Sequence, residues 1–269
     1  MPTLNHTVIT AEGAEPRRWL LMLHGIYGSG RNWAPIARRL VEEKPEWGVI
    51  LADLRLHGES QGFEPPHTLE AAAADVSALA AATGQHPEAV LGHSFGGKVA
   101  LAYARDHGDE LRQVWVVDST LRVREPGGSA WRVLEAVRSL PETFGSRDEL
   151  VEGMARFGYP AQLANWLGMN LERDGERLRW NLDWNGVEQM LSDYFRADLW
   201  PVVERPPKGV EVHLVAATES DSLDDGDAQR LEAAAEADRT HLHRVEGGHW
   251  INVDNPGAIV DLLVAHLPA

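Results

Sequence analysis

Short apolar segments and longer amphipathic segments alternate along this chain of 269 residues. The short segments are rich in Val, Ile and Leu and have the length of buried β-strands. They occupy residues 19–23, 49–54, 89–92, 114–118, 210–216 and 241–245. Helical patterns lie between them, at residues 33–43, 68–82, 95–106, 227–237 and 256–266. This alternation predicts an α/β fold in which helices cover both faces of a mostly parallel sheet.

The alternation breaks once, between residues 121 and 200, where the sequence is polar and helical and shows no strand pattern. The tryptophans of this segment are Trp131, Trp166, Trp180, Trp184 and Trp200. They could fill the core of a small helical subdomain, or line a substrate pocket if the segment forms a lid over the strand ends, and the two roles are compatible. We therefore expect a core formed by residues 1–120 and 201–269, with a helical cap at residues 121–200.

Composition narrows the classes of partner. The chain has 41 acidic and 25 basic side chains, a formal net charge of -16, which repels nucleic acid and anionic membranes. No apolar stretch approaches the ~18 residues of a membrane span, and the first residues lack the pattern of a secretion signal, so we expect a cytoplasmic protein. The absence of cysteine excludes disulfides, thiolate metal ligands and a cysteine nucleophile.

Candidate chemistry begins with the sequence GHSFG at residues 92–96, which places Ser94 between a predicted strand and a predicted helix. The G-x-S-x-G pattern is typical of a nucleophilic serine on a sharp turn, where side chains in place of the two glycines would collide. The N–H of Phe95 would then lie at a helix N-terminus, which favours developing negative charge. The five-residue pattern also arises by chance, and the alternative is a small residue in a tight turn. The strand before it and the helix after it favour the nucleophile.

Two other segments supply partners for this serine. The sequence LLMLHGIYGSGRNW ends the first strong strand, and the N–H of Ile26 is placed to be the second donor of an oxyanion hole. The alternative there is a glycine-rich turn into a helix capped by Ser29 or Asn32. A serine hydroxyl also needs an imidazole to take its proton. Among the 12 histidines, His249 follows the last predicted strand and two glycines, which makes it the candidate base.

Five segments in order, HGIYGSGRNW, DLRLHGES, LGHSFGGKVAL, VVDST and GGHWI, resemble the esterase branch of the α/β-hydrolase superfamily. Within it the chain is most similar to small bacterial esterases of the YbfF type, and RWNLDW at residues 179–184 resembles a cap motif of that group. The resemblance implies an α/β-hydrolase fold with a helical cap inserted after the sixth strand, and no cofactor. It also implies that DLRLHGES is an architectural loop in which Arg55 pairs with backbone or carboxylate groups.

The acid that would orient His249 is left open. Its usual place in the superfamily, after the strand at residues 210–216, is taken here by Ser220. Asp118, at the end of an earlier strand, is the first candidate, because YbfF-like members also carry a serine at the usual place. Asp221 is the alternative, through a slip of one residue. The remaining candidates are Glu219 and Asp224. Any of these carboxylates would fix the imidazole tautomer and stabilise the imidazolium.

The sequence thus predicts a carboxylesterase-like serine hydrolase that acts on a small-molecule acyl ester. Thioester cleavage, carbon–carbon bond hydrolysis and cofactor-free perhydrolysis use the same serine and stay open, as does a non-catalytic ligand-binding receptor. Haloalkane dehalogenation and epoxide opening are disfavoured, because the members that catalyse them carry aspartate in place of Ser94. No metal site is expected, because neither H-x-x-x-H nor E-x-x-H spacing lies on a helical face.

Overall fold

The computed structural model describes residues 2–235 and 239–269. A seven-stranded sheet with the order β1-β3-β2-β4-β5-β9-β10 lies at its centre. Its strands are β1 (His6–Ile9), β2 (Arg18–Leu23), β3 (Trp47–Ala52), β4 (Ala89–His93), β5 (Gln113–Val117), β9 (Glu211–Ala217) and β10 (Thr240–Val245). All neighbours are parallel except β1, which pairs antiparallel with β3. The predicted mostly parallel sheet is confirmed, with β1 as an additional edge strand.

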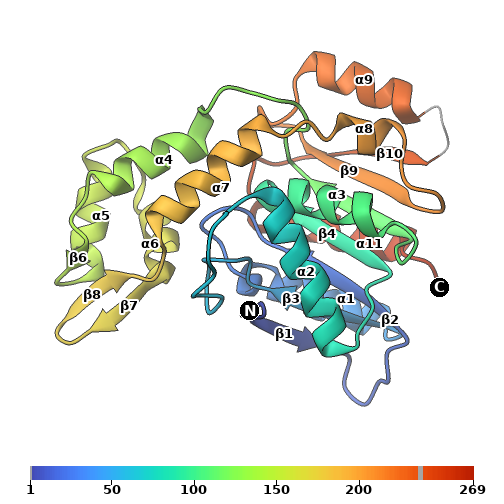
Figure 1. Cartoon of the computed structure of the whole chain (residues 1–269), viewed down its shortest axis with the longest axis horizontal. Helices are drawn as coiled ribbons and strands as arrows, with labels where there is room; N and C mark the ends of the chain where they lie inside the picture. The colour runs from blue at the N-terminus through green and yellow to red at the C-terminus, as the bar shows by residue number, and fades with distance from the viewer. Residues whose placement is uncertain (1, 236–238) are drawn as a thin grey trace.

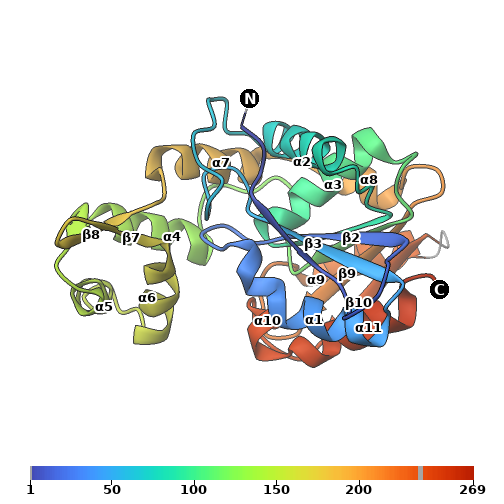
Figure 2. The ribbon, with the colours of Figure 1, turned by 90° about the horizontal axis from the view of Figure 1, so that it is seen from below.

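Helices cover both faces of this sheet (Figure 2). One face carries α1 (Ala34–Glu43), α10 (Ile251–Asp254) and α11 (Pro256–His266), and the other carries α2 (Leu69–Thr83), α3 (Phe95–His107), α8 (Trp200–Glu204) and α9 (Asp225–Ala235). Every residue of β3, β4 and β5 is therefore buried, as expected of strands covered on both sides. The helical patterns predicted from the sequence match these elements within two residues, except that the predicted end of α9 lies outside the described residues.

The segment between β5 and α8 projects to one side of the sheet (Figure 1). It contains α4 (Gly128–Arg138), α5 (Arg147–Ala155), α6 (Ala161–Leu167) and α7 (Trp184–Arg196). It also holds a three-stranded antiparallel sheet, formed by β6 (Thr143–Phe144), β7 (Leu171–Asp174) and β8 (Arg177–Trp180). The expectation that this segment lacks strands is wrong. These strands are short and largely exposed, so the alternation of charged and apolar residues in β8 covers too few residues to indicate a strand. The strand before the segment, which the resemblance counts as the sixth, is the fifth strand of this chain.

A buried lysine ties both ends of this segment to the core. Lys98 on α3 is fully buried, and its Nζ donates hydrogen bonds to the carbonyl oxygens of Arg122 (3.1 Å), Tyr194 (2.7 Å) and Ala197 (2.6 Å). Burial lowers the pKa of Lys98 to about 7. The three carbonyl acceptors oppose this effect, because they match the three donors of the charged ammonium form. Arg122 lies where the chain leaves the core and Ala197 where it returns, so one side chain holds both connections beside the start of α3.

In the part of the chain that the structure describes, no helix has both the length and the apolar character needed to cross a membrane.

Candidate active site

Ser94 is the single residue that connects β4 to α3, and its backbone is strained. It has φ 51° and ψ -115°, a positive φ that is uncommon for residues other than glycine. A Cβ atom on Gly92 would lie 2.0 Å from the carbonyl oxygen of Gly96, and one on Gly96 would lie 2.6 Å from the carbonyl oxygen of His24. Backbone atoms cannot move aside as the end of a side chain can, so both positions require glycine, as the motif predicts.

The structure brings Ser94, His249 and Asp118 together in one line. Nε2 of His249 lies 3.1 Å from Oγ of Ser94, and Nδ1 of His249 lies 2.6 Å from Oδ2 of Asp118. The three residues follow β4, β10 and β5, whose carboxyl ends share one edge of the sheet. Asp221 is outside this line, and its side chain is exposed. Of the two main acid candidates, therefore, only Asp118 touches the imidazole.

Asp118 is 1% exposed, and its carboxylate is surrounded by donors. Oδ2 accepts hydrogen bonds from the hydroxyls of Ser220 (2.6 Å) and Ser222 (2.9 Å), and Oδ1 accepts one from the N–H of Ala217 (3.2 Å). Burial by itself raises the pKa of Asp118, but the hydrogen bond and charge of His249, with the bonds from Ser220 and Ala217, outweigh it and hold the pKa below its ordinary value. The carboxylate is therefore ionised at neutral pH.

Ser222 has no signal in the sequence, and Ser220 is indicated there only as the residue in the usual place of the acid. Ser220 takes the usual place of the acid, yet its hydroxyl donates to the carboxylate that comes from β5. The only signal in the sequence is that serine itself, because a hydroxyl there can serve an acid supplied from another strand. The two remaining acid candidates lie elsewhere. Glu219 is exposed, and Asp224 is paired with Arg122.

His93, inside the serine motif, is another residue of the site that the sequence does not single out. It is buried, and its Nε2 donates a hydrogen bond to the carbonyl oxygen of His249 (2.7 Å). Burial is the main cause that lowers the pKa of His93 to about 3, and the charge of the neighbouring His249 adds to it, so this ring is neutral at ordinary pH. It fixes the backbone of the loop from which His249 reaches Ser94.

The two N–H groups expected to form an oxyanion hole are those of Ile26 and Phe95. Among the described residues, neither N–H donates a hydrogen bond to a protein acceptor. Phe95 begins α3, directly after the serine, and Ile26 lines the cavity that contains Ser94. Both residues are buried.

The loop that carries Ile26 is fixed through the next residue. Tyr27 has φ 66°, and its N–H donates to Nε2 of His57 (3.1 Å). Nδ1 of His57 in turn donates to the carbonyl oxygen of Arg55 (2.9 Å). Burial, together with the nearby His24, lowers the pKa of His57 to about 3, which keeps Nε2 available as an acceptor. The DLRLHGES segment thus supports the loop expected to bind the oxyanion.

The other polar residues of that segment make structural contacts. The carboxylate of Asp53 accepts hydrogen bonds from the N–H of Gly30 (2.8 Å) and of Glu59 (3.0 Å). The guanidinium of Arg55 binds the carboxylate of Asp75 (2.6 Å and 3.1 Å) and a backbone carbonyl (2.6 Å). These contacts agree with the architectural role expected for the loop.

A cavity of about 200 Å³ opens above Ser94 and His249. Its walls come from the core and from the projecting segment, and they are mostly apolar. The core supplies Ile26, Tyr27, Trp33 and Trp250, and the projecting segment supplies Ala130, Val133, Tyr159, Leu163 and Trp166. The rings of Trp166 and Trp250 lie 5.5 Å apart, so the two parts of the chain meet at this cavity.

The tryptophans of the projecting segment divide between the two roles considered. Among the described residues, Trp166 is the one of the five that lines the cavity. Trp180 and Trp184 pack edge to face with centroids 5.1 Å apart, and Trp200 is 1% exposed. Trp131 packs against Phe195. Most of these indoles therefore belong to the hydrophobic core, and one shapes the site.

Comparisons with known proteins identify a family and solved structures with a similar fold. The model of the alpha/beta hydrolase family matches residues 20–262. The chain is 24% identical to sn-1-specific diacylglycerol lipase ABHD11 of Mus musculus, over 98% of this chain and 85% of the relative. It is 32% identical to the putative carbamate hydrolase RutD of Caulobacter sp., over 60% of this chain and 56% of the relative. A solved marine microorganism esterase superposes with a TM-score of 0.85 at 23% identity, over 99% of this chain and 100% of that one.

The buried charge of Asp118 makes a prediction about stability and pH. A group whose pKa is lower in the folded state stabilises the fold above its unfolded-state pKa, and this contribution is lost as the pH falls through the folded-state value. We expect Asp118→Asn to be less stable than the wild type at pH 7, and the difference to narrow below about pH 4. Urea unfolding of both proteins between pH 7 and pH 3 measures this difference.

Asp221→Asn is the matched control, because that carboxylate is exposed and makes no contact with His249. Its stability should follow the wild type at every pH. A difference between Asp118→Asn and the wild type that stays the same size from pH 7 to pH 3 would contradict an ionised, stabilising carboxylate.

Proposed function

Because the chain belongs to the alpha/beta hydrolase family and has its fold, we propose that it is a serine esterase that cleaves a small acyl ester through an acyl-enzyme. The observation that carries this proposal is the line of hydrogen bonds from Asp118 through His249 to Ser94, at the base of an apolar cavity. Two of the compared proteins are named as a lipase and an esterase, which supports an ester substrate.

In the first half of the reaction, Oγ of Ser94 attacks the acyl carbon while Nε2 of His249 takes the hydroxyl proton. The imidazolium that forms is stabilised by the carboxylate of Asp118, 2.6 Å from Nδ1. The former carbonyl oxygen becomes an oxyanion and accepts hydrogen bonds from the N–H groups of Ile26 and Phe95. The tetrahedral intermediate collapses when the bond to the alcohol oxygen breaks, and Nε2 returns the proton to the leaving alcohol.

In the second half, water attacks the acyl carbon bound to Ser94. Nε2 of His249 takes a proton from this water, and the same two N–H groups bind the new oxyanion. The bond between the acyl carbon and Oγ then breaks, Oγ regains its proton from His249, and the carboxylic acid leaves. The strained backbone of Ser94 keeps Oγ at the base of the cavity throughout both halves.

The cavity walls favour an apolar acyl group. Leu163, Val133 and Trp166 offer hydrocarbon surface to a bound chain, and the projecting segment that carries them is tied to the core by Lys98. Within this proposal we assign the acyl group of the ester to this apolar part of the cavity.

Ser94→Ala tests the nucleophile. Its rate of p-nitrophenyl acetate hydrolysis should fall by roughly 10⁶-fold, because such groups act as a unit with their base. A fluorophosphonate probe should label the wild type at one site, located at Ser94 by peptide mass spectrometry, and should not label the variant. Ser139→Ala, an exposed serine on the projecting segment, is the control and should keep both turnover and labelling.

Two results would overturn the mechanism. If Ser94→Ala turned over esters at the wild-type rate, Ser94 would not be the nucleophile. If the wild type were neither labelled by the probe nor able to hydrolyse any ester, a ligand-binding receptor would be supported instead.

Trp166→Ala tests the assignment of the acyl pocket. Removing the indole enlarges the cavity, so the ratio of kcat/KM for p-nitrophenyl octanoate to kcat/KM for p-nitrophenyl acetate should rise about 10-fold. This is the low end of the discrimination that one methylene group provides in an apolar pocket. Trp131→Ala is the matched control, because this indole packs against Phe195 outside the cavity. An unchanged ratio in Trp166→Ala, or an equal change in both variants, contradicts the assignment. A thioester of the same acyl group, assayed in parallel, measures the preference for the leaving group.

A further inference from the structure

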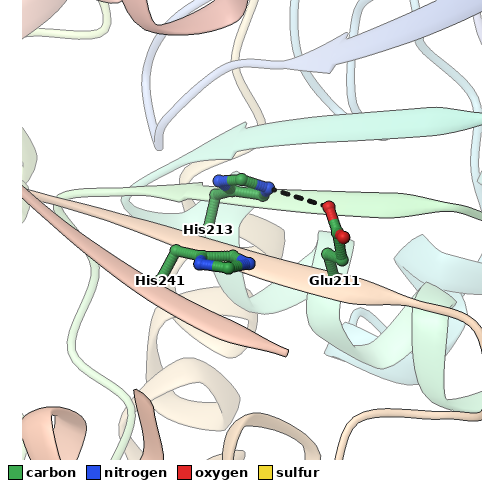
Figure 3. A group of neighbouring side chains, drawn as sticks. All are labelled: Glu211, His213 and His241. Atoms are coloured by element: carbon green, nitrogen blue, oxygen red, sulfur yellow. Dashed lines mark ion pairs between the residues drawn. The ribbon is translucent and has the colours of Figure 1, made fainter. Parts of the chain in front are cut away.

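A second group of polar side chains lies on β9 and β10 (Figure 3). It is at the opposite end of the parallel strands from Ser94. Glu211 is the first residue of β9, and the last residue of the same strand, Ala217, contacts Asp118 in the site. His213 follows two residues after Glu211 on the same face of the strand. His241 lies opposite His213 on the neighbouring edge strand β10. One ligand atom from each of Glu211, His213 and His241 lies within 4.8 Å of the others.

His213 is the central member of this group. The residue is 1% exposed, and within the described part of the chain its Nε2 makes no hydrogen bond. Oε2 of Glu211 lies 3.6 Å from this nitrogen, beyond hydrogen-bond distance. Buried polar atoms are paired in nearly all native structures, so this nitrogen requires an explanation. Figure 3 shows it aimed at the carboxylate of Glu211.

Neighbouring residues hold the ring of His213 in this orientation. Its Nδ1 lies 3.0 Å from Nε2 of His243, and its ring stacks on Trp115 with centroids 4.0 Å apart and planes 10° from parallel. If Nδ1 of His213 carries the proton and donates a hydrogen bond to Nε2 of His243, then Nε2 of His213 has a free lone pair. Hydrogen bonds of this kind, made by the second ring nitrogen, orient histidine ligands in metal sites.

The other two members provide matching ligands. The ring of His241 stacks on that of His213 with centroids 4.6 Å apart, and Figure 3 shows one of its nitrogens turned toward Glu211. The amide of Gln113 donates to Oε2 of Glu211 (3.0 Å) and keeps this carboxylate beside the rings. The side chain of Glu211 is 48% exposed, so an ion can enter from solvent. Binding of an ion would require rotation of Glu211 and His241, because the ligand atoms of a tetrahedral site are separated by ~3.4 Å.

We propose that Glu211, His213 and His241 bind one Zn²⁺ ion or a similar late first-row divalent cation. Two imidazole nitrogens and one carboxylate are a common set of protein ligands for zinc, with a fourth position left for water, whereas Mg²⁺ and Ca²⁺ prefer oxygen ligands alone. The ion joins β9 to the edge strand β10, far from Ser94 along the strands, so it stabilises the sheet and takes no part in hydrolysis. These ligands meet across two strands, so the ligand spacings typical of helices, which the sequence lacks, do not reveal them.

Isothermal titration of the full chain, freed of metal with EDTA, tests this site. We expect one Zn²⁺ to bind per chain and Mg²⁺ not to bind, and the midpoint of thermal unfolding to rise with Zn²⁺. Co²⁺ should give the visible absorption bands of a tetrahedral site with nitrogen ligands.

His241→Ala and Glu211→Gln should each weaken Zn²⁺ binding by more than about 10-fold, the lower end of what even outer-shell losses cost. These positions are partly exposed, so both variants should fold and keep wild-type ester hydrolysis, which serves as the check on folding. His86→Ala, an exposed histidine elsewhere, is the control and should bind Zn²⁺ like the wild type. The proposal fails if the wild type does not bind Zn²⁺, or if His241→Ala and Glu211→Gln bind it as tightly as His86→Ala. In either case His213 is a packing residue on Trp115.

Discussion

The ionised carboxylate of Asp118 is the constraint on which the arrangement of the site depends. A buried charge is costly unless it is paired and hydrogen-bonded, and this one is almost completely removed from solvent. Its donors come from the end of β9 at Ala217, from Ser220 and Ser222 in the following loop, and from His249 after β10. Satisfying one carboxylate therefore fixes two loops and, through His249, the distance from the imidazole to the serine.

A second set of contacts joins the projecting segment to the loop expected to bind the oxyanion. The hydroxyl of Tyr27 donates to the carbonyl oxygen of Ala130 (2.7 Å), and the carbonyl oxygen of Tyr27 accepts from the side chain of Asn170 (2.9 Å). Lys98 holds the two connections of the same segment from the other side. The wall of the cavity and the N–H of Ile26 are thus parts of one hydrogen-bonded unit, so the shape of the pocket and the geometry of the proposed reaction are coupled.

The sequence predicts much of this arrangement, for reasons that are local. Buried parallel strands are continuous apolar runs and amphipathic helices have a strong periodicity, so the sequence predicts both. The turn at Ser94 is also predictable, because only glycine fits at the two ends of the serine motif. The strands of the projecting segment could not, because they are short and exposed. The choice between Asp118 and Asp221 depends on which carboxylate the loop after β9 encloses. The grouping of His213 with His241 depends on the register between two strands that a helix separates in sequence. Both are tertiary properties that no local pattern contains.

We propose that Asp118, which follows β5 and is enclosed by serines of the loop after β9, orients the imidazole that activates Ser94. This role is tested by comparing kcat of Asp118→Asn and Asp221→Asn on one ester at pH 7. We expect Asp118→Asn, which keeps the shape but not the charge, to lose about 10³-fold to 10⁴-fold in kcat, and Asp221→Asn to turn over at the wild-type rate. A large loss in Asp221→Asn with little change in Asp118→Asn would contradict it.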